Sequence, residues 1–109
     1  MFVLYIIEND IVRMVYYPKE DYKILYYERS NTKNKMYDAI LENKTTKKKC
    51  RVPFGDKRYQ NYRDNTGLDL YPELIHGDKK RRENYRSRHQ KDLREGFYSP
   101  GWFAYYILW

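Results

Sequence analysis

The helical half of the fold is encoded in residues 76–109, which read HGDKKRRENYRSRHQKDLREGFYSPGWFAYYILW. Asp78 directly precedes a polar, strongly basic run and is a good N-cap for a helix from Lys79 to about Arg94. Gly96 lies where such a helix would need a residue that tolerates a positive φ. We therefore expect a basic helix, although the cations in its first turn oppose the helix dipole.

The expected basic helix has only one thin stripe suited to packing. Residues at positions i, i+3, i+7 and i+11 share one side of a helix, and here they are Arg82, Tyr85, His89 and Leu93. The remaining cations should be in water or in contact with a partner.

A second helix is expected at the end of the sequence, with Ser99 as N-cap and Pro100 as its first residue. Every residue in 101–109 is apolar, aromatic or glycine. Such a helix must be covered on most sides. We expect Trp109 to be packed, with an arginine near its main-chain end.

The first half of the chain has the pattern of β-structure. Five short segments rich in β-branched and aromatic residues follow one another at about ten-residue spacing, which favours an antiparallel sheet or a small open barrel; they are Phe2–Ile7, Ile11–Tyr17, Tyr22–Glu28, Met36–Leu41 and Lys49–Phe54. Residues 55–77 are rich in glycine, proline and asparagine but also carry leucine and tyrosine, which indicates an ordered loop that packs on the sheet.

The sequence thus predicts one α+β domain over residues 1–109. It would comprise an N-terminal antiparallel sheet of about five short strands in residues 1–54, a long packed loop in 55–77 and two C-terminal helices in 78–109. A chain of 109 residues is long enough for one such domain.

The charge is concentrated in the second part of the chain. Residues 1–43 hold six Lys and Arg against seven Asp and Glu, whereas residues 44–109 hold sixteen against eight. A basic half indicates an acidic partner, such as a phosphate backbone, an anionic lipid surface or an acidic protein face. The alternative is that these cations only solvate the surface.

The expected basic face consists of Lys79, Lys80, Arg81, Arg82, Arg86, Arg88 and Lys91. Arginine can grip phosphates and tyrosine can offer a stacking surface, and no complete signature of a base-reading module is present. General electrostatic binding is therefore expected rather than sequence-specific reading. The alternative is a set of internal ion pairs, of Arg81 or Arg82 with Asp78 and Glu83, or of Arg88 with Asp92.

Two further groups of residues are candidates for a metal site or a catalytic thiol. His76, Asp78 and His89 could in principle ligate a metal, but the spacing matches no zinc finger and a capping role for Asp78 is favoured. Cys50 follows three lysines, which would lower its thiol pKa if they stayed close, yet it has no identifiable base partner. We expect no enzyme activity, no cofactor and no metal.

Cellular setting is also constrained by the sequence. Cys50 is the only cysteine, so no internal disulfide can form, which fits a reducing compartment. The first ten residues lack the basic start of a signal peptide, and residues 102–109 are too few to span a bilayer. We expect a protein that is not secreted and has no membrane span.

Three motifs in the second half carry a resemblance, namely FGDKRYQNY, IHGDKKRRENYRSRH and SPGWFAYYILW. They resemble a family of small basic proteins encoded by large nucleocytoplasmic DNA viruses, the giant viruses, over about residues 54–109. The matching positions are Phe54, Gly55, His76, Asp78, Arg81 or Arg82, Tyr85, Arg88, His89, Leu108 and Trp109. The resemblance implies an origin and a setting, but no activity that can be transferred.

Together the residues and the resemblance suggest a non-enzymatic viral protein, a minor capsid or other virion component whose basic face meets acidic protein or genome. The alternative is a sequence-nonspecific nucleic-acid-binding protein that acts in the infected cell. The virion or the host cytoplasm with its virus factory would be its location. The expected structural anchors are Phe54, Gly55, Tyr85, His89, Trp102, Phe103 and Trp109.

Overall fold

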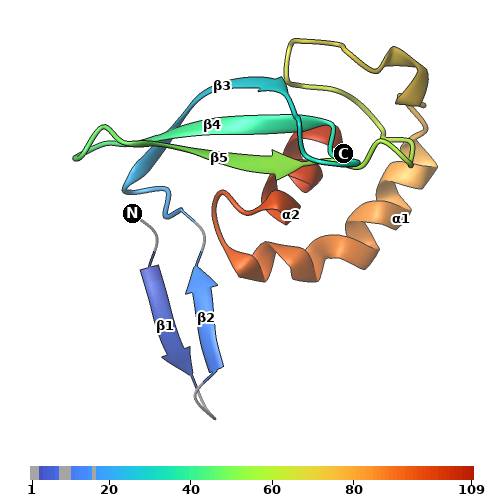
Figure 1. The fold of residues 1–109 in the computed structure, drawn as a ribbon. Coiled ribbons are helices and arrows are strands. Elements are labelled where there is room, and N and C mark those ends of the chain that lie inside the picture. The colour runs from blue at the N-terminus through green and yellow to red at the C-terminus, as the bar shows by residue number, and fades with distance from the viewer. Residues whose placement is uncertain (1–2, 8–10, 16) are drawn as a thin grey trace.

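The computed structural model describes residues 3–7, 11–15 and 17–109. Strands β1 (Val3–Ile7) and β2 (Ile11–Val15) pair as an antiparallel hairpin. A separate antiparallel sheet has the order β3-β4-β5, with β3 at Tyr22–Arg29, β4 at Tyr37–Asn43 and β5 at Lys49–Phe54. The helices follow in the C-terminal third, so the predicted α+β class is confirmed (Figure 1).

The prediction of one sheet of about five strands is wrong. The expected segments do form strands, but they are divided between the hairpin and the three-stranded sheet. The cause lies at Pro18, whose carbonyl accepts hydrogen bonds from the main-chain N–H groups of Asp21 and Tyr22, both at 3.0 Å. This tight turn redirects the chain before β3 begins, and Figure 1 shows the hairpin apart from the three-stranded sheet.

Strand β4 is the centre of the three-stranded sheet and is the most deeply buried element. Tyr37, Ala39 and Leu41 have no exposed surface. Asp38 points to the other face and is 1% exposed, where it accepts a hydrogen bond of 2.8 Å from Arg51 on β5. A buried carboxylate needs such a charged partner, since desolvation of an unpaired charge is costly.

Helix α1 spans Lys79–His89 and begins at the predicted cap. The main-chain N–H groups of Lys80 and Arg81 donate to Asp78 Oδ1, at 2.9 and 3.2 Å. The predicted end near Arg94 needs a correction, because the α-helix stops at His89 and a tighter 3-10 segment continues over Gln90–Glu95. Gly96, with φ of 89°, then ends the helical path.

Helix α2 is a short Pro100–Phe103 segment that continues as a π-helical stretch over Ala104–Leu108. Ser99 caps it as predicted, since its Oγ accepts a hydrogen bond of 3.1 Å from Trp102 N–H. Phe103 is fully buried and stacks on Phe54 of β5 with ring centroids 5.1 Å apart. The aromatic C-terminal segment therefore supplies much of the core that covers the sheet.

Residues 55–77 form an ordered loop with one 3-10 turn at Pro72–Leu74 and an isolated bridge between Asn61 and Ile75. Its main-chain hydrogen bonds to other segments run mainly to the C-terminal segment, because Tyr62 N–H donates to Leu108 O and Asn65 N–H to Ile107 O, both at 3.1 Å. The loop thus joins the end of the chain as well as covering the sheet.

Candidate binding site

The cations of α1 are divided between two sides of the helix. The predicted inward stripe is confirmed, because Arg82, Tyr85, His89 and Leu93 are all half-buried. The side chains that reach solvent belong to five residues of the predicted basic face, Lys79, Lys80, Arg81, Arg88 and Lys91. The other two, Arg82 and Arg86, are half-buried and turn toward the protein.

Arg82 and Arg86 are held at the end of the C-terminal segment together with Arg63 from the loop. Arg82 Nε donates to the main-chain oxygen of Trp109 at 2.7 Å, and Arg63 donates to that of Tyr106 at 3.0 Å. Arg86 lies 4.7 Å from the centroid of the Tyr105 ring. Carbonyls at the end of a helix carry partial negative charge, so these arginines stabilise the C-terminal segment, and the expected arginine near Trp109 is Arg82.

A continuous stack of rings connects α1 to the loop. His89, Tyr85 and Trp109 stack in this order with centroids 4.1 Å apart at each step, and His76 packs against Trp109 at 5.2 Å with the two rings tilted by 57°. Trp109 Nε1 donates to Asn61 Oδ1 at 3.2 Å, which fixes the indole in its plane. The stack explains why Trp109 is packed, with only 7% of its surface exposed.

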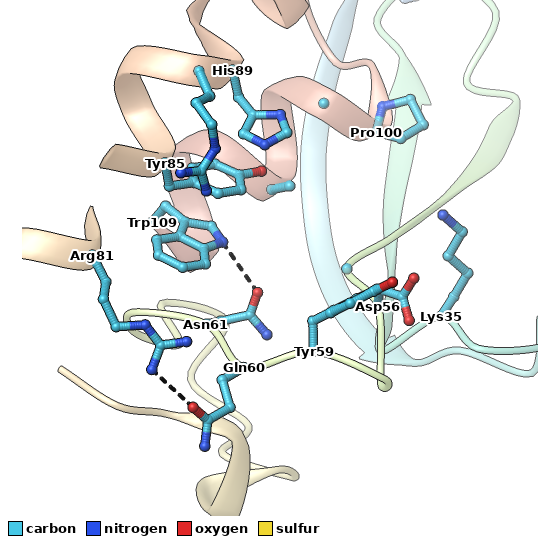
Figure 2. A pocket seen from close by; sticks show the side chains of 14 residues that line it. Lys35, Asp56, Tyr59, Gln60, Asn61, Arg81, Tyr85, His89, Pro100 and Trp109 are labelled. Carbon is cyan, nitrogen blue, oxygen red and sulfur yellow. Dashed lines mark hydrogen bonds between the residues drawn. The ribbon is translucent and has the colours of Figure 1, made fainter. Parts of the chain in front are cut away.

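One edge of this stack borders a cavity of about 610 Å³. Figure 2 shows Tyr85, His89 and Trp109 along one side, Lys35 and Asp56 on the opposite side. The wall is completed by main-chain and small side-chain surface at Gly55, Pro100, Gly101 and Ala104. The cavity is also lined by Tyr59, Gln60, Asn61, Arg81 and Arg88. This volume falls within the range of pockets that hold small molecules.

The charges around the cavity are mostly positive. Asp56 is its only acidic lining residue, and it is paired with Arg58 through hydrogen bonds of 2.9 and 2.7 Å. The hydrogen bonds from Arg58 hold the pKa of the Asp56 carboxyl near 2, despite partial burial. His89 Nδ1 lies 2.8 Å from Asp92 Oδ2, so Asp92 pairs with His89 and not with Arg88.

Tyr85 presents a neutral hydroxyl at the same edge of the stack. Burial, together with the nearby charge of Asp92, raises the pKa of Tyr85 to about 12. The phenol therefore remains a hydrogen-bond donor throughout the neutral range.

The two histidines that invited a metal interpretation lie at opposite ends of the stack, with Trp109 and Tyr85 between them. Asp78 caps α1, and its own N–H donates to His76 Nδ1 at 2.9 Å. Burial lowers the pKa of His76, and the nearby charge of Arg81 lowers it further. Within residues 3–7, 11–15 and 17–109, no three His, Cys, Asp or Glu side chains are grouped to hold a metal ion.

Cys50 lies on β5 and is half-buried. Burial raises the pKa of its thiol, and the hydrogen bond with Tyr17 only partly opposes this effect. The three preceding lysines, which would lower this pKa only if they stayed close to the thiol, are exposed to water, and the net shift is upward.

An aromatic surface lies on the outer side of α2. Phe97 and Tyr106 are each 40% exposed, and both contact Trp102, with centroid separations of 5.8 and 5.1 Å. The ammonium nitrogen Nζ of Lys19 lies over the Phe97 ring, 5.4 Å from its centroid. This aromatic patch (Phe97, Trp102 and Tyr106) is adjacent to the buried core and is partly open to solvent.

The sequence did not reveal the wall of the cavity opposite α1. Lys35, Asp56, Tyr59, Gln60 and Asn61 come from turns and the loop, where no periodic pattern marks a shared position. The available signal was the motif FGDKRYQNY, which runs from Phe54 through Tyr62. Residues from all three sequence motifs line this one cavity, among them Gly55, Arg81, Tyr85, Arg88, His89 and Trp109.

Comparison with protein-family models, with curated proteins and with solved structures gave no match for this chain. Within the described ranges, no helix is long and apolar enough to cross a bilayer. What this surface binds must therefore be inferred from its exposed cations, its aromatic patch and its cavity.

Proposed function

We propose that this chain is a non-enzymatic interaction protein whose basic face binds a polyanionic surface, as a minor capsid or other virion component that meets acidic protein or packaged genome. The viral setting follows from the resemblance of residues 54–109 to proteins of giant viruses. The polyanion-binding role follows from the exposed side of α1.

The observation that carries the proposal is the surplus of exposed cations on α1. Five cationic side chains, those of Lys79, Lys80, Arg81, Arg88 and Lys91, reach solvent along a helix and its 3-10 continuation. The ion pairs expected as an alternative are mostly missing among the described residues. Lys80 pairs with Glu83 at 3.6 Å, with both side chains more than 70% exposed, and such pairs contribute little.

The aromatic patch supports a second part of the proposed role, in which the protein docks to a neighbouring subunit. Phe97 and Tyr106 expose ring surface beside Trp102, and aromatic side chains are enriched at protein interfaces. A virion component must contact its neighbours, and a protein with a cationic helix and an aromatic patch offers both electrostatic and apolar contacts.

The second candidate is a sequence-nonspecific nucleic-acid-binding protein that acts in the infected cell. The first turn of α1 contains no acidic residue and four successive cations. This arrangement weakens the helix through its dipole, which makes it difficult to explain by stability alone. Phosphate contacts would offset that cost.

Binding to polyanions can be tested with three lysines on α1 and its 3-10 continuation that lie outside the cavity. The variant Lys79→Gln, Lys80→Gln, Lys91→Gln is compared with a control, Lys33→Gln, Lys48→Gln, Lys49→Gln, which removes the same charge from other exposed lysines. Random duplex, random single strands and polyglutamate are titrated at two salt concentrations. The α1 variant should bind more weakly and with a shallower salt dependence, by about 0.9 in the logarithmic slope per lost duplex phosphate contact.

Equal effects of the two variants would show that net charge, and not α1, attracts the polyanion, and would overturn the proposal. Preference for polyglutamate favours an acidic protein partner, and preference for either nucleic acid favours the genome. The two candidate settings are separated by mass spectrometry of purified virus particles and of infected cells. A protein that is abundant in cells but missing from particles contradicts the virion role and supports the second candidate.

A further inference from the structure

The cavity beside the ring stack combines three kinds of surface that one ligand can use together. The edges of Tyr85 and His89 form one side, and Lys35 lies on the opposite side (Figure 2). Between them lies Gln60, which is exposed and whose amide N–H groups can pair with the polar edge of a ligand, whereas the buried amide of Asn61 is already bonded to Trp109 and Met36. Tyr59, 65% exposed, places an open ring at the same cavity.

The cavity also holds positive charge that its own residues do not neutralise. Arg58 already pairs with the carboxylate of Asp56. Among the described residues, the side chains of Lys35 and Arg88 have no hydrogen-bonding partner and no ion pair. Arg81 uses one nitrogen to donate to Gln60 at 2.9 Å and has further N–H groups to offer. The cavity is thus suited to an anionic group.

We propose that this cavity binds a single nucleotide, with its phosphate held by Arg88 on the α1 side, Lys35 supplying positive charge from the opposite side, and its base stacked on Tyr59. Arginine and lysine supply charge-assisted hydrogen bonds to phosphate oxygens. A base can stack on an exposed tyrosine ring whatever its sequence. The amide of Gln60 and the hydroxyl of Tyr85 would face the polar edge of the base or the sugar.

A nucleotide suits the cavity better than a purely apolar or purely anionic ligand. An apolar ligand would leave two cations desolvated without partners, which is costly. Inorganic phosphate alone would leave the ring of Tyr59 and most of the 610 Å³ unused. The inference goes beyond the proposed function, since it holds whether the outer face of α1 meets protein or nucleic acid.

Trp109 provides a direct reporter of binding. The chain has two tryptophans, and Trp109 lines the cavity whereas Trp102 lies in the aromatic patch. The full chain carrying Trp102→Phe therefore has its only indole at the cavity. Titration of this protein with mononucleotides should change the Trp109 fluorescence in a saturable manner.

The ligand series separates the parts of the nucleotide and its source. A 5′-mononucleotide should bind at least about tenfold more tightly than the matching nucleoside, because the nucleoside lacks the charge-assisted contacts of the phosphate. It should also bind more tightly than inorganic phosphate. A short single strand that binds better than the mononucleotide identifies an unpaired nucleotide of a strand as the occupant, and equal or weaker binding identifies a free nucleotide.

Variants then assign the contacts. Arg88→Gln and Lys35→Gln should each weaken mononucleotide binding about tenfold, and Tyr59→Ala should weaken binding of both nucleotide and nucleoside about five- to tenfold. Arg94→Gln is the matched control, because Arg94 is exposed on the 3-10 continuation of the same helix, does not line the cavity and is not part of the basic face. The circular dichroism of each variant should match that of the parent.

No saturable change of Trp109 fluorescence at millimolar nucleotide would overturn the inference. So would equal weakening by Arg94→Gln and Arg88→Gln, because this would mean that the net charge of the protein, and not the cavity, attracts the nucleotide. Neither result would bear on binding of polyanions by the outer face of α1, which is measured with the separate lysine variants.

Discussion

The indole of Trp109 lies flat on the phenol ring of Tyr85, with ring centroids 4.1 Å apart and planes only 2° from parallel. The contact joins the last residue of this sequence to the middle of α1. It also places an aromatic edge beside the cavity. The packing of the C-terminal segment, the position of the basic helix and the shape of the candidate site therefore depend on one another.

Replacement of Trp109 should strongly destabilise the protein. Trp109 is 7% exposed and stacks on Tyr85, so Trp109→Ala should lower the free energy of unfolding by about 3–5 kcal/mol, the range for loss of a buried large aromatic. Trp102→Ala should cost less, because Trp102 is only partly buried. Chemical denaturation measures both variants, with Tyr106→Ala, 40% exposed, as the control. Unchanged unfolding of Trp109→Ala would contradict the stack as an anchor.

Gly55 should tolerate no side chain. Its φ is 76°, and an added Cβ would lie 2.9 Å from Leu108 Cδ1 and 3.0 Å from Met36 Sδ. Gly55→Ala combines backbone strain with overpacking and should cost about 2–4 kcal/mol. Gly67→Ala is the control, since its φ is 84° but no atom lies within 4 Å of the added Cβ. Thermal unfolding should therefore separate the two variants, and equal losses would contradict the close approach of Leu108.

The N-cap residue Asp78 should stabilise the protein both through its hydrogen bonds and through its negative charge. Asp78→Ala removes an acceptor for two N–H groups and should cost about 0.5–2 kcal/mol. Asp78→Asn keeps the acceptor but loses the negative charge beside four cations, so it should cost less than Asp78→Ala. Denaturant titration at low and high salt checks this, because only the charge effect should shrink with salt.

Alkaline pH should destabilise the protein through buried phenols. Burial raises the pKa of Tyr27, Tyr37 and Tyr85 to about 12, from 10 for an exposed phenol. Their contribution to stability is therefore complete below pH 10 and is lost as the pH rises from 10 toward 12. Denaturation midpoints across this interval measure the loss.

Tyr85→Phe provides the matched test of this alkaline loss. The variant keeps the ring in the stack and removes one titrating group, so its stability should fall less steeply between pH 10 and 12. A slope identical to that of the parent would show that the hydroxyl of Tyr85 ionises as freely in the folded protein as in the unfolded chain.

The secondary structure was largely predictable, because the signals are local. Asp78 and Ser99 cap helices where the sequence places them, and the five β-segments became strands at nearly the expected positions. Strand pairing was not predictable, because the turn at Pro18 depends on hydrogen bonds that no composition reveals. The basic side of α1 was visible as charge, but the inward direction of Arg86 and the cavity walls depend on tertiary packing.

The connection between the loop and the end of the sequence has a consequence for how the protein folds. Asn61 and Trp109 share a hydrogen bond although they are 48 residues apart along the chain, and Leu108 O accepts from both Tyr62 and Arg63 N–H. Contacts of such high sequence separation slow folding, since a long segment must close before they form. During synthesis, strands β3–β5 can pair early, whereas the loop and α1 must wait for the final residues of this sequence to leave the ribosome.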